Sequence, residues 1–170
     1  MTSNHRNRGM FLEKVINMSN KQYLERNLAL INKIPTPTSI NKRKGTARYT
    51  EKSTVDFTGV SLGTFIAFDA KEVAINRFDF NRLQPHQENY LKNAFLQKGE
   101  AFLLILFKQT NALYRIDIHE YQYVKQMYER DGRKSIPLSW FEENKRPIKS
   151  KNGIYYDYLG KAHMVKGGGY

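Results

Sequence analysis

The chain has 170 residues, 40% of them apolar, with ten Phe and eleven Tyr, which allows one domain with a substantial core and excludes a disordered tail. It has no cysteine, which excludes disulfides, zinc–thiolate sites and thiol chemistry. Lys and Arg number 28 against 16 acidic residues, a net charge of +12, so the sequence predicts a polyanionic partner, with nucleic acid ahead of a membrane surface.

Residues 1–8 are polar and basic, which predicts a flexible basic arm. Apolar residues then recur at helical spacing over residues 9–27 and predict a helix. Glu13 falls just beyond the edge of the apolar face, where it is either a surface residue or a carboxylate that reaches a neighbouring site. Arg8 lies at the helix entry, where its charge opposes the helix dipole and favours an anionic ligand nearby.

A strand is predicted over residues 28–34, and Pro35 and Pro37 end it because proline cannot donate to a central ladder. The excursion that follows, residues 35–52, is strongly basic. It is either a solvated loop or a projection between two strands that grips phosphates. The candidate DNA-binding residues of this excursion are Lys42, Arg43, Lys44 and Arg48.

The stretch 53–72 is typical of a β-hairpin, because two arms rich in β-branched and aromatic residues flank a turn with a glycine on each side. With the turn centred on residues 61–62, Asp56 lies opposite Ala67, and side chains alternate between the two faces. The residues expected together on one face are Thr54, Asp56, Asp69 and Lys71. The residues expected to face the core are Val55, Phe57, Ile66 and Phe68.

Two carboxylates and an amine on one face of a hairpin are costly to bury unless a positive group lies between them. A divalent metal is the natural candidate, because hard cations prefer carboxylate oxygens. The alternative is a solvated outer face of the sheet that carries a surface Asp–Lys pair.

After an irregular connection over residues 73–83, a helix is predicted from Pro85 to Gly99, since proline favours the first turn and glycine the cap. Gln87 lies in the first turn on the inward side. It either bonds the backbone or gives a neutral oxygen to a site on the adjoining strands.

Strands over 101–107 and 112–118 and a helix over 119–129 are predicted next. A basic turn at 132–137 brings two further candidate DNA-binding residues, Arg133 and Lys134. Residues 154–159 either add a short strand or pack on the domain, and 160–170 are expected to be a loose tail.

This order of elements predicts a single α/β domain over residues 1–170, with a mixed β-sheet flanked by helices on both faces. No stretch is apolar enough to cross a bilayer, and the first residues lack the pattern of a signal peptide. Together with the lack of cysteine, this predicts a cytoplasmic protein.

The chain resembles the PD-(D/E)XK nuclease superfamily and, more narrowly, the RecU-type Holliday junction resolvases. The resemblance rests on an ordered set of motifs that covers nearly the whole chain. These are Asn7-Arg8-Gly9-Met10 with Leu12-Glu13, Pro35-Thr36-Pro37, Thr54 to Val60, Phe68 to Glu72, His86-Gln87, and Gly132 to Pro137.

The resemblance implies a restriction-endonuclease-like core with a basic projecting excursion, and a magnesium-dependent endonuclease, with Mn²⁺ as a substitute. It implies a homodimer that resolves four-way DNA junctions in recombination and repair, with a recombinase or branch-migration protein as a further partner. Residues matching the family's magnesium ligands are Thr54, Asp56, Asp69 and Gln87, while Lys71 matches its transition-state stabiliser. Glu13 matches a supporting carboxylate, and Arg8 and the excursion match parts associated with DNA.

Two features depart from the family. Asp69 stands where the family usually has Glu, and the excursion between Pro37 and Ser53 is shorter than the family's stalk, which enters the junction. Two alternatives therefore stay open. One is a related endonuclease that acts on other branched or duplex DNA. The other is a DNA-binding recombination accessory protein without catalysis.

Overall fold

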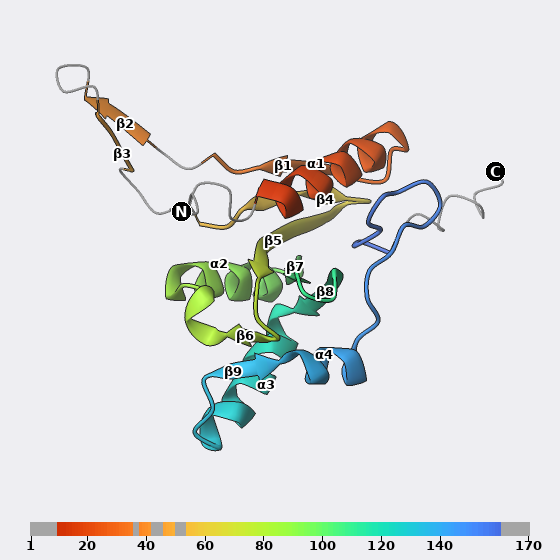
Figure 1. Ribbon diagram of the computed structural model, residues 1–170. Helices are drawn as coiled ribbons and strands as arrows, with labels where there is room; N and C mark the ends of the chain where they lie inside the picture. Colours follow the sequence, from red (N-terminus) through yellow and green to blue (C-terminus); the bar gives the residue numbers. More distant parts are fainter. Residues whose placement is uncertain (1–9, 36–37, 42–45, 50–53, 161–170) are drawn as a thin grey trace, which may run out of the picture.

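A computed structural model describes residues 10–35, 38–41, 46–49 and 54–160, with the side chains of 38–41 and 46–49 outside the description. Helices and short strands alternate along these ranges (Figure 1). In chain order the elements are α1 (Met10–Glu25), β1 (Leu30–Lys33), β2 (Thr38–Asn41), β3 (Thr46–Tyr49), β4 (Phe57–Ser61), β5 (Thr64–Val73), β6 (Arg77–Asp79), the 3₁₀ helix η2 (Phe80–Arg82), α2 (Pro85–Leu96), β7 (Glu100–Phe107), β8 (Ala112–Asp117), α3 (Ile118–Arg130), β9 (Ser135–Pro137) and α4 (Leu138–Asn144).

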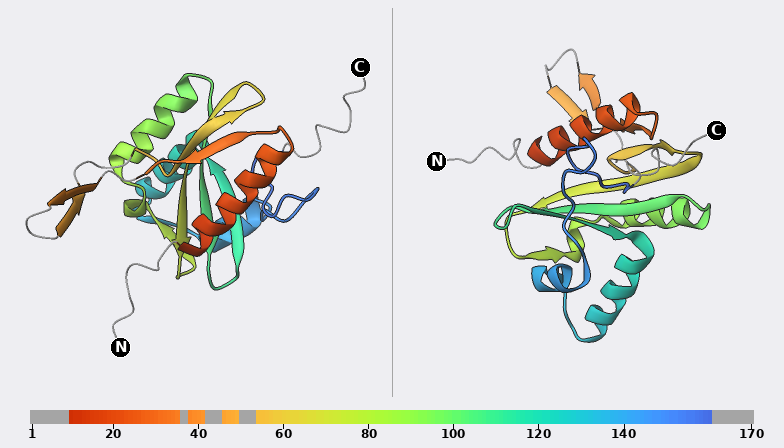
Figure 2. Two further views of the ribbon diagram at one scale, coloured as in Figure 1. Left: turned by 90° about the horizontal axis from the view of Figure 1, so that it is seen from above. Right: turned by 90° about the vertical axis from the view of Figure 1, so that its right-hand side faces the viewer.

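A five-stranded mixed sheet organises the molecule, in the order β1-β4-β5-β7-β8. β5 and β7 are parallel, and α2 lies between them in the sequence, while the other neighbours in the sheet are antiparallel. α1 covers one face of the sheet, and α2 and α3 cover the other (Figure 2). β7 is continuously apolar because it is central and covered on both faces. The predicted α/β architecture is confirmed.

The two faces of the sheet bury separate cores. On the α1 face, the rings of Phe57, Phe68 and Phe102 stack across three strands, with centroids 4.8 and 4.9 Å apart. On the other face, side chains of α2 and α3 pack against β5, β7 and β8. Alternate residues of β5 therefore enter opposite cores, so that Phe68 and Asp69 point to different faces.

The predicted hairpin forms β4 and β5, but its expected register is wrong. The turn is at Leu62 and Gly63, with φ of 47° and 83°, so Ser61 pairs with Thr64 and Thr58 takes the place expected for Asp56 opposite Ala67. Positive φ at both turn residues is typical of a type I′ turn, which matches the twist of the flanking strands. Moving the turn by one residue shifts each partner by two, so the faces within the ladder are unchanged.

The face expected for Val55 is also wrong. β4 begins at Phe57, so the strict alternation of the strand does not extend back to Val55, which packs in the core on the α2 side. Gly59 has a clear reason to be glycine. A Cβ atom there would lie 2.0 Å from the carbonyl oxygen of Leu30 in the neighbouring strand.

The excursion between β1 and β4 contains the antiparallel pair β2 and β3, in which Thr38 pairs with Tyr49 and Asn41 with Thr46. This pair projects away from the sheet and helices (Figures 1 and 2), as predicted for the fold. β6 and β9 pair in a smaller two-stranded sheet. For these residues the sequence predicts only an irregular connection and a basic turn. Strands of three residues are too short for a clear alternating pattern.

Residues 145–160 form a segment that we call the strap. The backbone N–H of Ile148 donates to Leu113 of β8, and the N–H of Tyr156 donates to Ser19 Oγ of α1, at 2.7 and 2.9 Å. The hydroxyl of Tyr23 donates to Asp157 at 2.7 Å. The strap therefore joins the edge strand of the sheet to α1. Of the two alternatives for residues 154–159, packing on the domain is the observed one.

Candidate active site

Asp56 and Asp69 meet just beyond the last pair of the β4–β5 ladder. The backbone N–H of Asp56 donates to Asp69 Oδ1 at 3.2 Å, and Asp56 Oδ2 accepts a bond from the N–H of Ala70 at 2.9 Å. Each carboxylate is thus held by the backbone of the opposite arm of the hairpin. The corrected register produces this, because it places Asp56 across from Asp69.

Lys71 lies two residues after Asp69 on β5 and projects from the same face. Its Nζ is 2.6 Å from Asp69 Oδ2, with the Asp69 side chain fully buried and the Lys71 side chain 19% exposed. Lys71 is thus the charged partner of Oδ2, an oxygen that makes no further hydrogen bond with the described residues. Such an oxygen is available to a further cation.

Gln87 reaches the same carboxylate from the first turn of α2. Its Nε2 donates to Asp69 Oδ1 at 3.0 Å, and its Oε1 accepts a bond from the backbone N–H of Gln84 at 3.1 Å. Gln84 and Gln87 form a reciprocal capping box at the start of the helix. The chemistry fixes the orientation of the Gln87 amide, because a backbone N–H must face oxygen and a carboxylate must face the NH₂ group.

The environment of Asp69 disfavours its charged form. Burial raises the pKa of Asp69 from 3.8 to about 7, because the carboxylate loses its hydration. The Lys71 ammonium opposes this rise, and the nearby Asp56 carboxylate adds to it. A site that pushes a carboxylate toward neutrality gains free energy from a second cation beside Lys71.

The arrangement fits a divalent cation through two carboxylates, one of which has a buried oxygen whose partner within the described ranges is the Lys71 ammonium. Groups of three or more His, Cys, Asp or Glu side chains suited to a metal do not occur in the parts of the chain that the structure describes. The remaining ligands of such an ion would therefore be neutral oxygens, water or the substrate.

The structure does not bring two other predicted residues into this cluster. Thr54 is exposed, and within the described ranges its side chain makes none of the contacts given for Asp56 and Asp69. Glu13 forms an ion pair with Lys33 of β1, at 2.5 Å, on the opposite face of the sheet.

Sequence reasoning missed the role of Glu72, which connects α1 to β5 next to Lys71. Its Oε1 accepts a bond from the backbone N–H of Leu12 at 2.9 Å, so it satisfies a free donor at the start of α1. The available signal was alternation, since the residue after Lys71 must point toward the α1 face.

The predicted DNA-binding residues are only partly described. Arg8, Lys42, Arg43 and Lys44 lie outside the described residues, as does the side chain of Arg48 in β3. Arg133 and Lys134 are exposed between α3 and β9. The Arg133 guanidinium lies 5.1 Å from the centre of the Tyr128 ring. This stacking orients Arg133 without removing its charge from solvent.

Fold and site together define a basic α/β protein with two acids and a lysine gathered on one hairpin. The chain belongs to the RecU family, since the family model described as Recombination protein U matches residues 7–164. It is 35% identical over 162 residues to the Holliday junction resolvase RecU of Staphylococcus aureus strains JH9 and Mu3, covering 89% of this chain and 78% of each relative. A structure of Hjc, a Holliday junction resolvase from Archaeoglobus fulgidus, is 11% identical with a TM-score of 0.39, over 61% of this chain and 77% of that one.

Each helix in the described ranges is too short or too polar to cross a bilayer.

Proposed function

We propose that this protein is a metal-dependent endonuclease that resolves four-way DNA junctions by paired phosphodiester cleavage. The observation that carries the proposal is the convergence of Asp56, Asp69 and Lys71 at the end of one hairpin, in a chain of the RecU family. The net charge of +12 supports a polyanionic substrate. The relatives named as Holliday junction resolvases support the choice of junction DNA.

Asp56 and Asp69 would hold the ion, which we propose to be Mg²⁺ because the site offers hard oxygen donors. When bound, the ion supplies a water of lowered pKa and neutralises charge on the phosphate. In the hydrolysis, water forms a bond to phosphorus and loses a proton to solvent, and the bond to the leaving deoxyribose oxygen breaks as that oxygen takes up a proton. Lys71, already held beside Asp69, places its positive charge where the phosphate acquires negative charge.

Gln87 and Thr54 complete the proposed ligand set of the ion, although Thr54 is exposed and lies outside the cluster without the ion, and Glu13 is proposed to support the site from the α1 face of the sheet. The contact between Gln87 Nε2 and Asp69 supports the place of Gln87 beside the ion. To offer oxygen, however, the Gln87 amide must turn and release the N–H of Gln84. Ligation by Gln87 is thus coupled to the start of α2.

A junction requires two symmetric cuts, so we propose that two copies act as a two-fold homodimer. An uncharged surface supports this proposal. Leu30, Val60 and Phe65 are cross-strand neighbours on β1, β4 and β5, with 47%, 41% and 42% of each residue exposed. Alternation along β5 puts Phe65 on the same face as Asp69. Two strongly basic chains repel one another least through such an apolar row.

The test is cleavage of a synthetic mobile four-way junction with and without Mg²⁺, against a linear duplex of matched sequence. We expect paired, Mg²⁺-dependent cuts in the junction, and Asp56→Asn should lose cleavage while still binding DNA. Equal cleavage of the linear duplex would point to an endonuclease of broader substrate range. If no substrate is nicked in the presence of Mg²⁺, the protein would be a DNA-binding accessory protein and not an endonuclease.

A further inference from the structure

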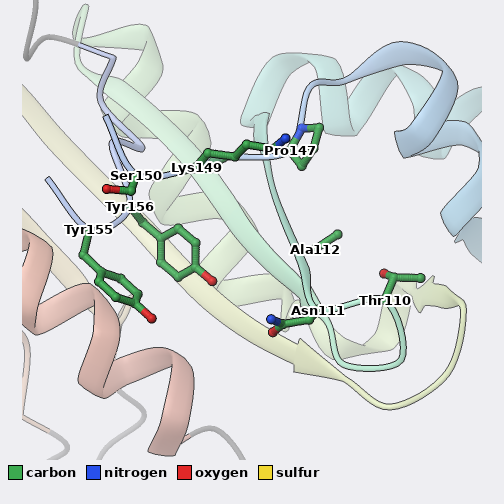
Figure 3. A pocket seen from close by; sticks show the side chains of 9 residues that line it. Thr110, Asn111, Ala112, Pro147, Lys149, Ser150, Tyr155 and Tyr156 are labelled. Carbon is green, nitrogen blue, oxygen red and sulfur yellow. The ribbon is translucent and has the colours of Figure 1, made fainter. Parts of the chain in front are cut away.

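A hollow of about 470 Å³ lies between the strap and the β7–β8 turn, away from the carboxylate cluster (Figure 3). Thr110 and Asn111 of the turn form one side, and Lys149, Tyr155 and Tyr156 of the strap form the other. In Figure 3 the Tyr156 ring extends from the strap toward the turn. The lining combines aromatic rings, amide and hydroxyl groups and a cation, and the described residues around it include no acid.

The backbone of the two tyrosines is tied to α1, while their side chains stay accessible. The backbone N–H of Tyr155 donates to Gln22 Oε1 at 2.7 Å, and that of Tyr156 donates to Ser19 Oγ at 2.9 Å, so both are tied to α1. Tyr155 nevertheless remains 43% exposed. The two rings meet edge to face, with centroids 5.1 Å apart and planes at 83°, so they do not stack on one another. The half-exposed Tyr155 ring therefore offers a face on which a third ring can stack.

The strap also concentrates positive charge beside these rings. The strap contains four cations, and its one acid, Asp157, accepts the hydrogen bond from the Tyr23 hydroxyl. Lys145 pairs with Glu120, whereas Arg146, Lys149 and Lys151 are exposed and form no ion pair with a described carboxylate. Lys108 is exposed in the turn on the other side of the hollow. Solvated lysines alone would be an ordinary basic surface, but here they flank an anchored aromatic platform.

From this arrangement we infer that the strap hollow binds an unpaired nucleotide of DNA. The base stacks on Tyr155, and the adjoining phosphates lie against Lys149 and its neighbouring cations. This is the general pattern of sites for single-stranded nucleic acid, in which aromatic rings take bases and cations follow the backbone. The hollow belongs to the α1 side of the sheet, whereas Gln87 of α2 contacts the carboxylate cluster from the other side. This binding therefore goes beyond the proposed cleavage.

The test measures binding of oligothymidylate carrying 2-aminopurine to the full chain in EDTA, where cleavage cannot occur. We expect quenching of the 2-aminopurine by wild type, and affinity about tenfold weaker in Tyr155→Ala, as for the loss of one stacked base. Tyr155→Phe keeps the ring and should restore both affinity and quenching. Lys149→Gln should weaken binding and reduce its dependence on salt.

Tyr123→Ala is the matched control, because Tyr123 is 63% exposed on α3, on the opposite side of the sheet. It should bind oligothymidylate as wild type does. Equal affinities of wild type and Tyr155→Ala, failure of Tyr155→Phe to restore quenching, or tighter binding of oligouridylate than of oligothymidylate would each overturn the assignment. If wild type binds oligothymidylate as expected but does not cleave four-way junctions with Mg²⁺, only the proposed function would be contradicted.

Discussion

In the proposed site, the protonation of the Asp69 carboxyl would link stability to metal binding. Its pKa is raised from 3.8 to about 7 by burial, so the folded state binds its proton more tightly than the unfolded state. Its contribution to the free energy of unfolding is therefore full below about pH 4 and is lost as pH rises through 7. A bound divalent cation stabilises the charged form and counters this loss.

We predict that the melting temperature of the metal-free protein falls between about pH 4 and pH 7, and that Mg²⁺ raises it more at pH 8 than at pH 5. Thermal melts in EDTA and in Mg²⁺ across this range are the measurement. Asp69→Asn is the control, since it removes the titration and should flatten this part of the profile. A Mg²⁺ effect independent of pH would contradict the role given to Asp69.

Lys71 has two separable effects on the site. Its charge opposes the rise in the Asp69 pKa, and in the proposed mechanism it also stabilises the phosphate. Lys71→Ala should therefore lower the single-turnover cleavage rate by about 10²- to 10³-fold. It should also move the acidic limb of the pH–rate profile to higher pH. A lowered rate without that movement would mean that Lys71 and Asp69 are not electrostatically coupled in the working enzyme.

The orientation of the Gln87 amide in the metal-free protein can be tested by hydrogen exchange. Its Oε1 accepts the Gln84 N–H, so that amide should exchange slowly with solvent in the metal-free protein. If Gln87 turns its oxygen to a bound ion, Mg²⁺ should speed hydrogen exchange at Gln84, measured by NMR. Unchanged exchange together with normal Mg²⁺ affinity would mean that Gln87 positions Asp69 and is not a ligand.

At the scale of elements, Glu72 couples β5 to the start of α1. Removing its carboxylate leaves the Leu12 N–H without its partner, so Glu72→Ala should lower the free energy of unfolding by about 1 kcal/mol. Glu72→Gln keeps an acceptor oxygen and should recover most of the loss in urea unfolding. Equal destabilisation by Ala and Gln would indicate that the charge, and not the hydrogen bond, holds α1 in place.

At the scale of the whole molecule, the apolar row predicts how two copies meet. If the proposed dimer forms, Phe65→Asp would bring like charges together across its two-fold axis, so sedimentation should show a dimer for wild type and a monomer for this variant. Met127→Asp, at a similarly exposed position on α3, is the control and should remain dimeric. On junction DNA, the monomeric variant should make single uncoupled nicks. If wild type sediments as a monomer on DNA, the proposed dimer and the role of the apolar row in it are contradicted.

Sequence reasoning predicted the mixed sheet, its main helices and the group of Asp56, Asp69 and Lys71, because strand alternation and apolar periodicity are local properties. It misplaced the hairpin turn by one residue, since the positive φ of Leu62 is decided by the sheet on either side. It also gave Val55 the wrong core, because the point at which β4 begins depends on its pairing with β1 and β5.

What the chain by itself determined is which residues share a face and which chemistry they can supply, because side-chain direction repeats every two residues in a strand and every 3.6 in a helix. The distances between segments far apart in the sequence do not follow from any such local periodicity. Only the packed structure decided that Asp56 faces Asp69, that Gln87 turns its oxygen toward Gln84, and that the strap ties two tyrosines to α1. Those contacts depend on the simultaneous fit of the sheet, its helices and the strap, which no single stretch of sequence contains.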